Sequence, residues 1–325
     1  MFDLTLDRPH PLQRADKGLP MLLVANAEAW PGFQTTVDML KSGSDSLAAM
    51  VTGIGLVEAD ARVRSVGLGG WPNMLGVMEC DAAIMDGNTR EVGSVGAVPD
   101  TIPVAARAHE VMRRLPHVML TGAGARRFAD EIGFVRDEVL LDDSRSVWRD
   151  RLEKELTPAE LAQFPDIALA PLCRAITDPE RVRDTTVFLA ADRARGIHAA
   201  TSTSGWAWKY PGRLGDSPVP GAGFYADSRY GAAACTHTGE MALRCATART
   251  VVLAMKLGRS LSDAVALAVE ELAELKEGFL GGVVIHAVDA AGNHRVVDFR
   301  CGGEIRYWFW EEGMAAPELR AAAAA

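Results

Sequence analysis

The chain has 325 residues, enough for one large domain or two ordinary ones. Its 48% hydrophobic and 24% charged residues are typical of a globular protein and exclude a disordered chain. The net charge of −9 and the lack of a Lys- or Arg-rich run argue against a nucleic-acid partner. No stretch approaches the roughly 18 consecutive apolar residues of a membrane span, so no membrane partner is expected either.

The N-terminus and the cysteines favour a cytoplasmic protein. The first seven residues carry acids where a signal peptide has Lys or Arg, and no apolar core follows. The five cysteines are scattered and form no CxxC pair, which fits free thiols in a reducing compartment. We expect the first twenty residues to form a polar arm, and we interpret 321–325 as a frayed helix end or an added tail outside the fold.

Short apolar runs and helical periodicities follow one another in the first half. Residues 21–25 predict a buried strand. Ser44 is placed to cap a helix whose apolar residues recur every three or four positions up to Ile54. Further strands are predicted at 64–70, 80–85, 92–98 and 117–120, and helices at 103–115 and 125–132.

A charged segment, 134–184, separates this half from the second. After it the pattern predicts strands at 185–191, 197–204, 282–287, 294–299 and 305–310, a loop at 206–230, a helix at 239–257 and another capped by Ser262. This order is not strict βαβ alternation, so a doubly wound sheet is disfavoured. Two sheets with helices on their outer faces account for it better.

Common catalytic motifs are missing from the sequence. It has no HExxH, no GxSxG, no P-loop and no zinc-ligand spacing. Gly122-Ala123-Gly124 opens a predicted helix, but Arg126-Arg127 follows where a dinucleotide-binding fingerprint needs a third Gly. We interpret His198 and His286 as packed strand residues. No metal and no cofactor are therefore expected.

Thr185 opens the second half directly after the charged segment. A Thr hydroxyl is a poor nucleophile unless a base lies beside it, and its own α-amine can be that base because it titrates near neutrality. This chemistry requires the chain to be cut before Thr185. The alternative is that Thr185 merely starts a strand, as β-branched residues commonly do, and the local pattern alone favours that alternative.

From about residue 21 to about residue 310, the chain resembles the glycosylasparaginase and plant-type asparaginase (isoaspartyl peptidase) family of N-terminal nucleophile hydrolases. The similar motifs occur in one order: 25–31, 64–70, 81–87, 93–95, 184–185, 201–203, 212–216 and 231–234. The longer run 212–227 is more similar to the glycosylasparaginase branch. The resemblance implies an α/β protein, a four-layer αββα sandwich of the N-terminal nucleophile hydrolase type, built as one domain over residues 1–325.

The resemblance also implies self-processing. Asp184 would assist an N-to-O acyl shift that cuts the chain into an α subunit, 1–184, and a β subunit, 185–325. Thr185 would then be the nucleophile and its freed amine the general base. Thr203 would place a second hydroxyl beside that amine. The family implies a dimer of αβ units.

The remaining implied roles concern the substrate. Arg213 would hold the α-carboxylate of an aspartyl group, a bidentate contact that suits a guanidinium, and Asp216 would hold its α-ammonium. Thr236 and the backbone N–H that follows it would form the oxyanion hole. Ser65 and Trp30 would line the pocket. The alternative for the charged pair is a surface ion pair of little consequence.

The sequence departs from the family pattern at several positions. Arg183 stands where the family usually has His, and both Val187 and His237 stand where it usually has Gly. Gly32 changes the spacing of the first aromatic pair, and the run 206–210 is unusually aromatic. We expect His237 to bring an imidazole to the pocket mouth. These departures leave the aspartyl-binding pair intact and alter the side of the leaving group.

We therefore expect an amidohydrolase that cleaves β-aspartyl amides through an acyl-enzyme, without a cofactor. Its candidate substrates are N-acetylglucosaminyl-asparagine, isoaspartyl dipeptides and asparagine. An acyltransferase that passes the acyl group to an amine or alcohol is the first alternative. An uncleaved protein that only binds aspartyl ligands is the second.

Overall fold

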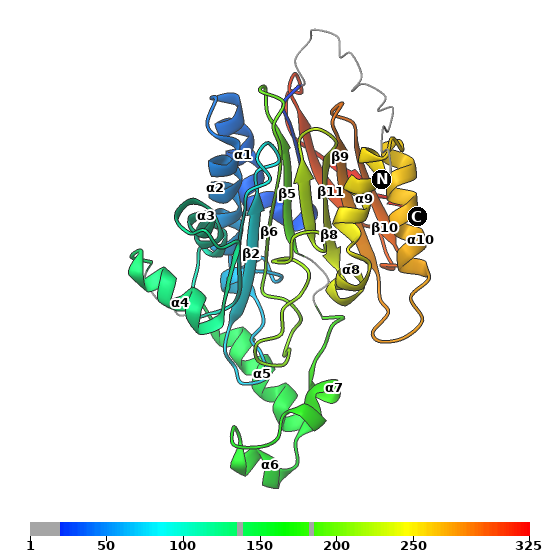
Figure 1. The fold of residues 1–325 in the computed structure, drawn as a ribbon. Coiled ribbons are helices and arrows are strands. Elements are labelled where there is room, and N and C mark those ends of the chain that lie inside the picture. The colour runs from blue at the N-terminus through cyan, green and yellow to red at the C-terminus, as the bar shows by residue number, and fades with distance from the viewer. Residues whose placement is uncertain (1–19, 135–138, 182–184) are drawn as a thin grey trace, which may run out of the picture.

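Two β-sheets lie face to face in the computed structural model, which describes residues 20–134, 139–181 and 185–325 (Figure 1). The first sheet has eight strands in the spatial order β12 (Glu318–Ala321), β11 (Arg306–Glu311), β1 (Leu22–Asn26), β5 (Thr186–Ala191), β6 (Ile197–Thr203), β2 (Glu79–Met85), β3 (Val92–Pro99) and β4 (Met119–Thr121). The second has five, in the order β13 (Ala323–Ala324), β10 (His294–Phe299), β9 (Val283–Asp289), β8 (Gly231–His237) and β7 (Phe224–Asp227).

Helices cover the outer face of each sheet (Figure 1). The first sheet carries α1 (Trp30–Lys41), α2 (Ser46–Glu58), α3 (Val104–Arg114) and α4 (Gly122–Glu131). The second carries α8 (Gly239–Cys245), α9 (Thr247–Lys256) and α10 (Leu261–Ala273). The predicted four-layer αββα sandwich is confirmed.

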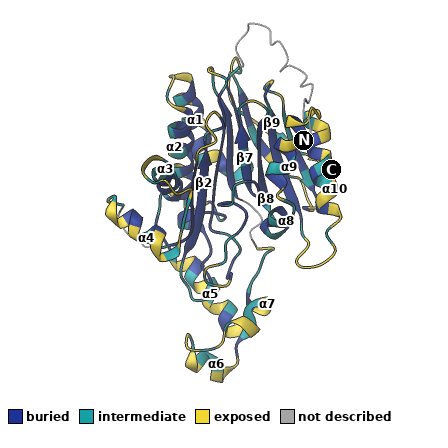
Figure 2. Cartoon of the chain, viewed as in Figure 1, coloured by how far each residue is buried: buried dark blue, intermediate teal, exposed yellow. Residues whose placement is uncertain are grey.

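Alternation along the strands builds the three apolar interfaces between the four layers. On β1, Leu23 points toward the helices while Leu22 points toward the second sheet. On β8, Ala234 faces the first sheet while Cys235 faces α8 to α10. Both faces of each central strand are therefore buried, as Figure 2 shows by the dark strands at the centre of the molecule.

The charged segment folds into a helical extension beyond the sheets. It contains α5 (Asp142–Glu155), α6 (Pro158–Gln163) and α7 (Cys173–Ile176), which extend below the sandwich in Figure 1 and are largely exposed in Figure 2. Leu152 and Leu156 pack there against Trp71 and Trp208. Among the described residues, none of the helices has both the length and the apolar composition of a membrane span.

Some predicted boundaries are wrong for local reasons. Residues 64–70 form a loop with a single 3-10 turn instead of a strand. Asp45, not Ser44, caps α2, because its carboxylate accepts from the Ala48 N–H at 2.8 Å. Ser260, not Ser262, caps α10.

Other elements were not predicted at all. The C-terminal alanines form β13 beside β10, so they belong to the fold and are not a frayed helix end. The strand β8 is Ala-rich, and Thr236 is the single residue in it of the β-branched kind that identifies a strand in a sequence. The predicted helix 239–257 is interrupted at Ala246, whose backbone is left-handed with φ of 46°.

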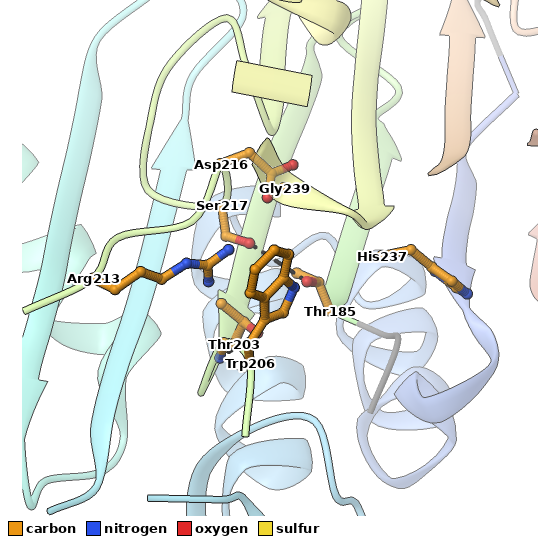
Figure 3. Close-up of a pocket in the computed structure, with 9 residues that line it drawn as sticks. Thr185, Thr203, Trp206, Arg213, Asp216, Ser217, His237 and Gly239 are labelled. Atoms are coloured by element: carbon orange, nitrogen blue, oxygen red, sulfur yellow. Dashed lines mark hydrogen bonds between the residues drawn. The ribbon is translucent and has the colours of Figure 1, made fainter. Parts of the chain in front are cut away.

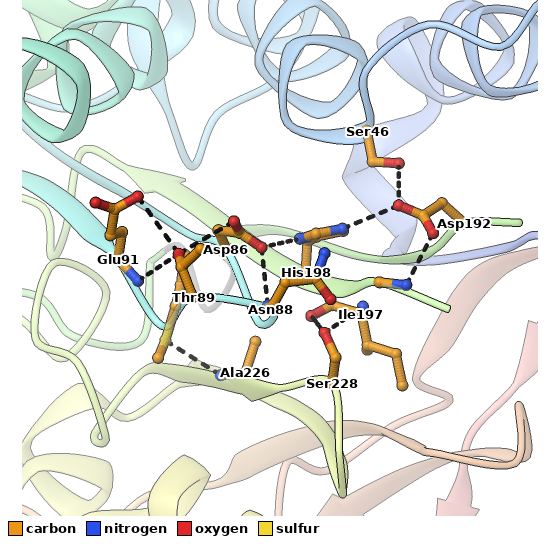
Figure 4. A network of polar contacts seen from close by, with 12 residues as sticks. Ser46, Asp86, Asn88, Thr89, Glu91, Asp192, Ile197, His198, Ala226 and Ser228 are labelled. Atoms are coloured by element: carbon orange, nitrogen blue, oxygen red, sulfur yellow. Dashed lines mark hydrogen bonds and ion pairs between the residues drawn. The ribbon is translucent and has the colours of Figure 1, made fainter. Parts of the chain in front are cut away.

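A buried polar network closes the end of the sandwich at the turn between β5 and β6 (Figure 4). His198 is only 4% exposed, and its ring nitrogens lie 3.1 Å from Asp86 Oδ1 and 3.2 Å from Asp192 Oδ2. Asp192 in turn accepts from Ser46 at the start of α2. The network therefore joins two turns of the first sheet to the helix layer, and His198 is a packed strand residue, as predicted.

The contact of α1 with α2 depends on glycine. A Cβ built on Gly53 would lie 1.9 Å from Thr36 Oγ1 and 2.9 Å from a ring carbon of Phe188. A Cβ on Gly55, in the same helix, would meet only Pro103 at 3.6 Å, an ordinary contact.

We therefore expect Gly53→Ala to destabilise the fold by about 1–3 kcal/mol through overpacking. Gly55→Ala is the matched control, and it should be neutral or stabilise by up to about 1 kcal/mol because Ala favours helix. Urea denaturation of both variants measures this difference. Equal stabilities of the two variants would contradict the close contact at Gly53.

Candidate active site

Thr185 lies at the end of the sheet where β5 begins. Thr186 pairs with Ser202, so the antiparallel register places Thr185 opposite Thr203 at the end of β6. Thr185 is 5% exposed. Nine residues line a pocket at this point (Figure 3): Thr185, Thr203, Gly205, Trp206, Arg213, Asp216, Ser217, His237 and Gly239.

The start of β5 is held from the first half of the chain. The backbone N–H of Val187 donates to Asn26 Oδ1 at 3.1 Å, which ties β5 to the end of β1. The Val187 side chain is fully buried between the two sheets. Val187 therefore does not line the pocket, because its side chain points into the core between the sheets.

Thr203 is fixed by backbone groups on both sides. Its Oγ1 accepts from the Gly205 N–H at 3.0 Å and donates to the Ser65 carbonyl at 3.3 Å. The Ser65 hydroxyl donates to the Glu28 carboxylate. Ser65 is fully buried and lies behind Thr203, outside the set of lining residues.

Arg213 is already engaged by a carboxylate. Its Nε and Nη2 donate to Glu240, at the start of α8, over distances of 2.7 to 3.0 Å. Its guanidinium carbon lies 4.5 Å from the centre of the Trp206 ring. Nη1 is directed elsewhere, into a space kept open by two glycines, since a Cβ on Gly205 or Gly215 would come within 3.1 Å of it. The sequence interpretation missed Glu240, the acid that follows the family-like loop by 24 positions.

Asp216 is buried, and its neighbours offset only part of the cost of burying its charge. It is 5% exposed, and its Oδ2 has no hydrogen-bond partner among the described residues. Burial raises the pKa of Asp216 to about 7, and the nearby Arg213 offsets this only in part. Gly239 packs against it so closely that a Cβ there would lie 2.5 Å from Oδ1. A bound cation would stabilise the ionised form of Asp216.

Thr236 and His237 end β8 beside the pocket. Thr236 is 2% exposed, and its Oγ1 lies 2.8 Å from His237 Nδ1. His237 has a left-handed backbone with φ of 81°, a conformation that Gly adopts without strain. In Figure 3 its ring extends away from Thr185. The backbone of His237, more than its imidazole, is therefore the part directed at Thr185.

The sequence interpretation missed Ser217, which lines the pocket, and Lys209, which lies behind the lining residue Gly205. Ser217 Oγ lies 3.5 Å from Thr185 Oγ1, and the Ser217 carbonyl accepts from Thr201 at 2.7 Å. Lys209 is 1% exposed, and its Nζ donates to the carbonyls of Glu79 and Ser204. A charged residue inside an aromatic run was the only signal for Lys209.

The pocket brings together most of the predicted site residues. Thr185, Thr203, Arg213, Asp216 and His237 line it, and the buried Thr236 adjoins it. In the described part of the chain, no three His, Cys, Asp or Glu side chains are arranged to bind a metal ion.

Two residues predicted to line the pocket, Trp30 and the buried Ser65, are not among its lining residues. Trp30 is 41% exposed at the start of α1, and the Arg62 guanidinium lies 4.2 Å from its ring centre. Asp184 and its neighbour Arg183 lie outside the described residues.

The fold and this pocket define an αββα protein of two face-to-face sheets with a polar pocket at one end of the first sheet. Residues 31–318 match the asparaginase family. The N(4)-(beta-N-acetylglucosaminyl)-L-asparaginase of Elizabethkingia miricola is 36% identical over 253 residues, which cover 78% of this chain and 67% of the relative. The protein of that name from Rattus norvegicus is 30% identical over 293 residues, 84% of this chain and 83% of the relative. The chain belongs to the asparaginase family.

The raised pKa of Asp216 predicts that ionisation of this carboxyl group destabilises the folded protein as the pH rises. The folded value of about 7 lies above the unfolded value of about 3.9, so the folded protein holds a proton that the unfolded chain releases. The contribution of Asp216 to stability is therefore most favourable at low pH and is lost as the pH rises towards 7. Asp216→Asn should gain about 2 kcal/mol relative to the wild type between pH 5 and pH 8.

Urea denaturation of both proteins at the two pH values measures this gain. Asp227→Asn is the control, because hydrogen bonds from Arg229 outweigh the effect of burial and lower the pKa of Asp227. Its effect on stability should be the same at pH 5 and pH 8. A constant difference between wild type and Asp216→Asn would show that Asp216 is ionised throughout.

Proposed function

We propose that Thr185 is an N-terminal nucleophile and that the protein hydrolyses β-aspartyl amides. The observation that carries this proposal is the shared pocket: Thr185 lies in it with an arginine and a buried, incompletely compensated carboxylate, Arg213 and Asp216. Such a pair suits the two charged groups of a free amino-acid end, and a hydroxyl beside it suits acyl transfer.

The nucleophile would be made by self-processing. Thr185 Oγ attacks the carbonyl carbon of residue 184, the peptide C–N bond breaks, and the acyl group moves to oxygen as an ester. The Asp184 carboxylate would assist this shift. The shift frees the Thr185 α-amine, which takes up the proton of the hydroxyl. Water then hydrolyses the ester, which restores the Thr185 hydroxyl, leaves a carboxylate on residue 184 and divides the chain into subunits 1–184 and 185–325.

In the processed enzyme the α-amine takes the proton from Thr185 Oγ as it attacks the substrate amide. Thr203 lies opposite Thr185 in the β5–β6 register and would place its hydroxyl beside that amine. The Thr236 O–H and the His237 backbone N–H would stabilise the tetrahedral oxyanion. The leaving amine departs with the proton, and water hydrolyses the aspartyl ester.

The charges of the pocket suit an aspartyl substrate. Its α-ammonium would pair with Asp216 and favour the ionised carboxylate, in the way that opposite charges shift a pKa. Its α-carboxylate would bind Arg213 at Nη1, since Glu240 occupies Nε and Nη2. Both contacts hold the free end of the substrate, so they are compatible with several leaving groups.

The names of the relatives point to one leaving group. They make N4-(β-N-acetylglucosaminyl)-L-asparagine the first substrate to test, with isoaspartyl dipeptides and asparagine next. Acyl transfer to an added amine remains the alternative reaction on the same acyl-enzyme, although burial of Val187 removes one reason for it. A dimer of αβ units is part of this proposal.

Self-processing predicts two fragments from the purified wild-type protein. A denaturing gel and intact mass should give pieces that correspond to 1–184 and 185–325, and sequencing of the second should begin Thr185-Thr186-Val187. Thr185→Ala should remain one chain and release no amine from any β-aspartyl substrate. A wild-type chain that stays whole for days, or a Thr185→Ala protein that retains activity, would reject the proposed nucleophile.

Arg213 offers a test of substrate binding that leaves the nucleophile unchanged. Lys has no guanidinium fork and cannot satisfy Glu240 and a substrate carboxylate together. We expect Arg213→Lys to be processed and to raise KM at least about tenfold, a loss that corresponds to about 1.4 kcal/mol. Arg62→Lys, at the distant Trp30 contact, should leave KM unchanged. Equal KM values in all three proteins would argue against a carboxylate site at Arg213.

A further inference from the structure

We propose that the His237 side chain is a positioning residue for the oxyanion hole: its Nδ1–H donates to Thr236 Oγ1 and so directs the proton of Thr236 toward the substrate. The inference rests on the proposed function, in which Thr236 is an oxyanion donor. It goes further by giving a role to the imidazole of His237, whereas the proposed reaction uses only its backbone N–H.

The geometry that carries the inference is the contact between neighbouring side chains at the end of β8. Thr236 Oγ1 and His237 Nδ1 are 2.8 Å apart, a full hydrogen bond. Thr236 is 2% exposed, so water has little access to its hydroxyl. The ring extends away from Thr185 in Figure 3, so it acts on the reaction through Thr236.

Counting protons shows why the direction of this bond matters. A Thr hydroxyl has one proton to donate and two lone pairs to accept. If Nδ1 is bare, the Thr236 proton is committed to the imidazole and cannot reach an oxyanion. If Nδ1 carries a proton, the hydroxyl accepts from the ring, and its own proton is available to the substrate oxygen. An oxyanion role for Thr236 therefore requires Nδ1–H.

The backbone conformation at position 237 limits which side chains can replace His237. The left-handed φ of 81° is a conformation in which Asn, Asp and His are the more common non-glycine residues. Asn and Asp can therefore replace His237 without a new backbone clash, and each has a polar atom at about the place of Nδ1. Asn offers an N–H there, and Asp offers only an acceptor.

The matched pair of variants is His237→Asn and His237→Asp, assayed with the substrate that the wild type cleaves and normalised to the processed fraction. We expect the Asn variant to keep kcat within about threefold of the wild type. The Asp variant should lose at least tenfold in kcat, up to the hundredfold typical of a lost oxyanion donor. KM should change less than threefold in both, because the hydroxyl acts on the transition state.

The same two variants made in a Thr236→Val protein test whether His237 acts through the Thr236 hydroxyl or whether the negative charge of Asp affects the reaction directly. If His237 acts through the hydroxyl, the difference in kcat between the Asn and Asp variants should shrink to threefold or less in that background. A difference that persists there, or Asn and Asp variants with equal kcat beside an active wild type, would overturn the inference and leave the proposed function standing. A wild type without Thr185-dependent amidase activity would instead reject the proposed function.

A spectroscopic measurement does not depend on the variants being processed. Nitrogen-15 NMR of histidine-labelled wild-type enzyme distinguishes a protonated Nδ1 from a bare one, and His237→Asn assigns the signal by its disappearance. We expect protonated Nδ1 at His237. A bare Nδ1 in the processed enzyme would overturn the inference.

Discussion

The antiparallel pairing of β5 with β6 is the constraint on which the site depends. Because Thr186 pairs with Ser202 in antiparallel register, the next two residues that face each other are Thr185 and Thr203, at the end of the sheet. A slip of one residue would turn every side chain of β5 to the opposite face and would move Thr185 out of its place opposite Thr203. Such a slip would also exchange side chains between two packed layers, since Phe188 fills the helix side while Val187 and Leu189 fill the side of the second sheet.

The charges around this point form a coupled set. Glu240 compensates Arg213 before any substrate arrives, so the guanidinium needs no ligand to be stable. The carboxyl group of Asp216 then has no full counter-charge, and its burial raises its pKa to about 7. In the proposed function, a zwitterionic amino-acid end would supply the missing cation to Asp216, and its carboxylate would find only one side of Arg213 open. The site is therefore poised for an ammonium group more strongly than for an anion.

The architecture could be predicted from the sequence because its main strands and helices have clear residue patterns. The β-branched start of β5, the hairpin β9–β10 and the order of elements give two sheets covered by helices, as found. The Ala-rich strand β8 had no such pattern, because burial on both faces selected small residues over β-branched ones. Glu28 and Glu240 could not be found either, since each meets its partner, Ser65 or Arg213, across 27 or more positions of chain.

Two departures from the family pattern show that the position of a residue within its strand decides whether its side chain reaches the pocket or the core. Val187 and His237 both stand where the family usually has Gly. Val187 lies within β5 on the face that points to the second sheet, so its side chain adds to the core and does not reach the pocket. His237 ends β8 with a left-handed backbone, and its ring turns back onto the hydroxyl of Thr236. Of the two, only His237 lines the pocket, and it does so next to a hydroxyl that its own ring contacts.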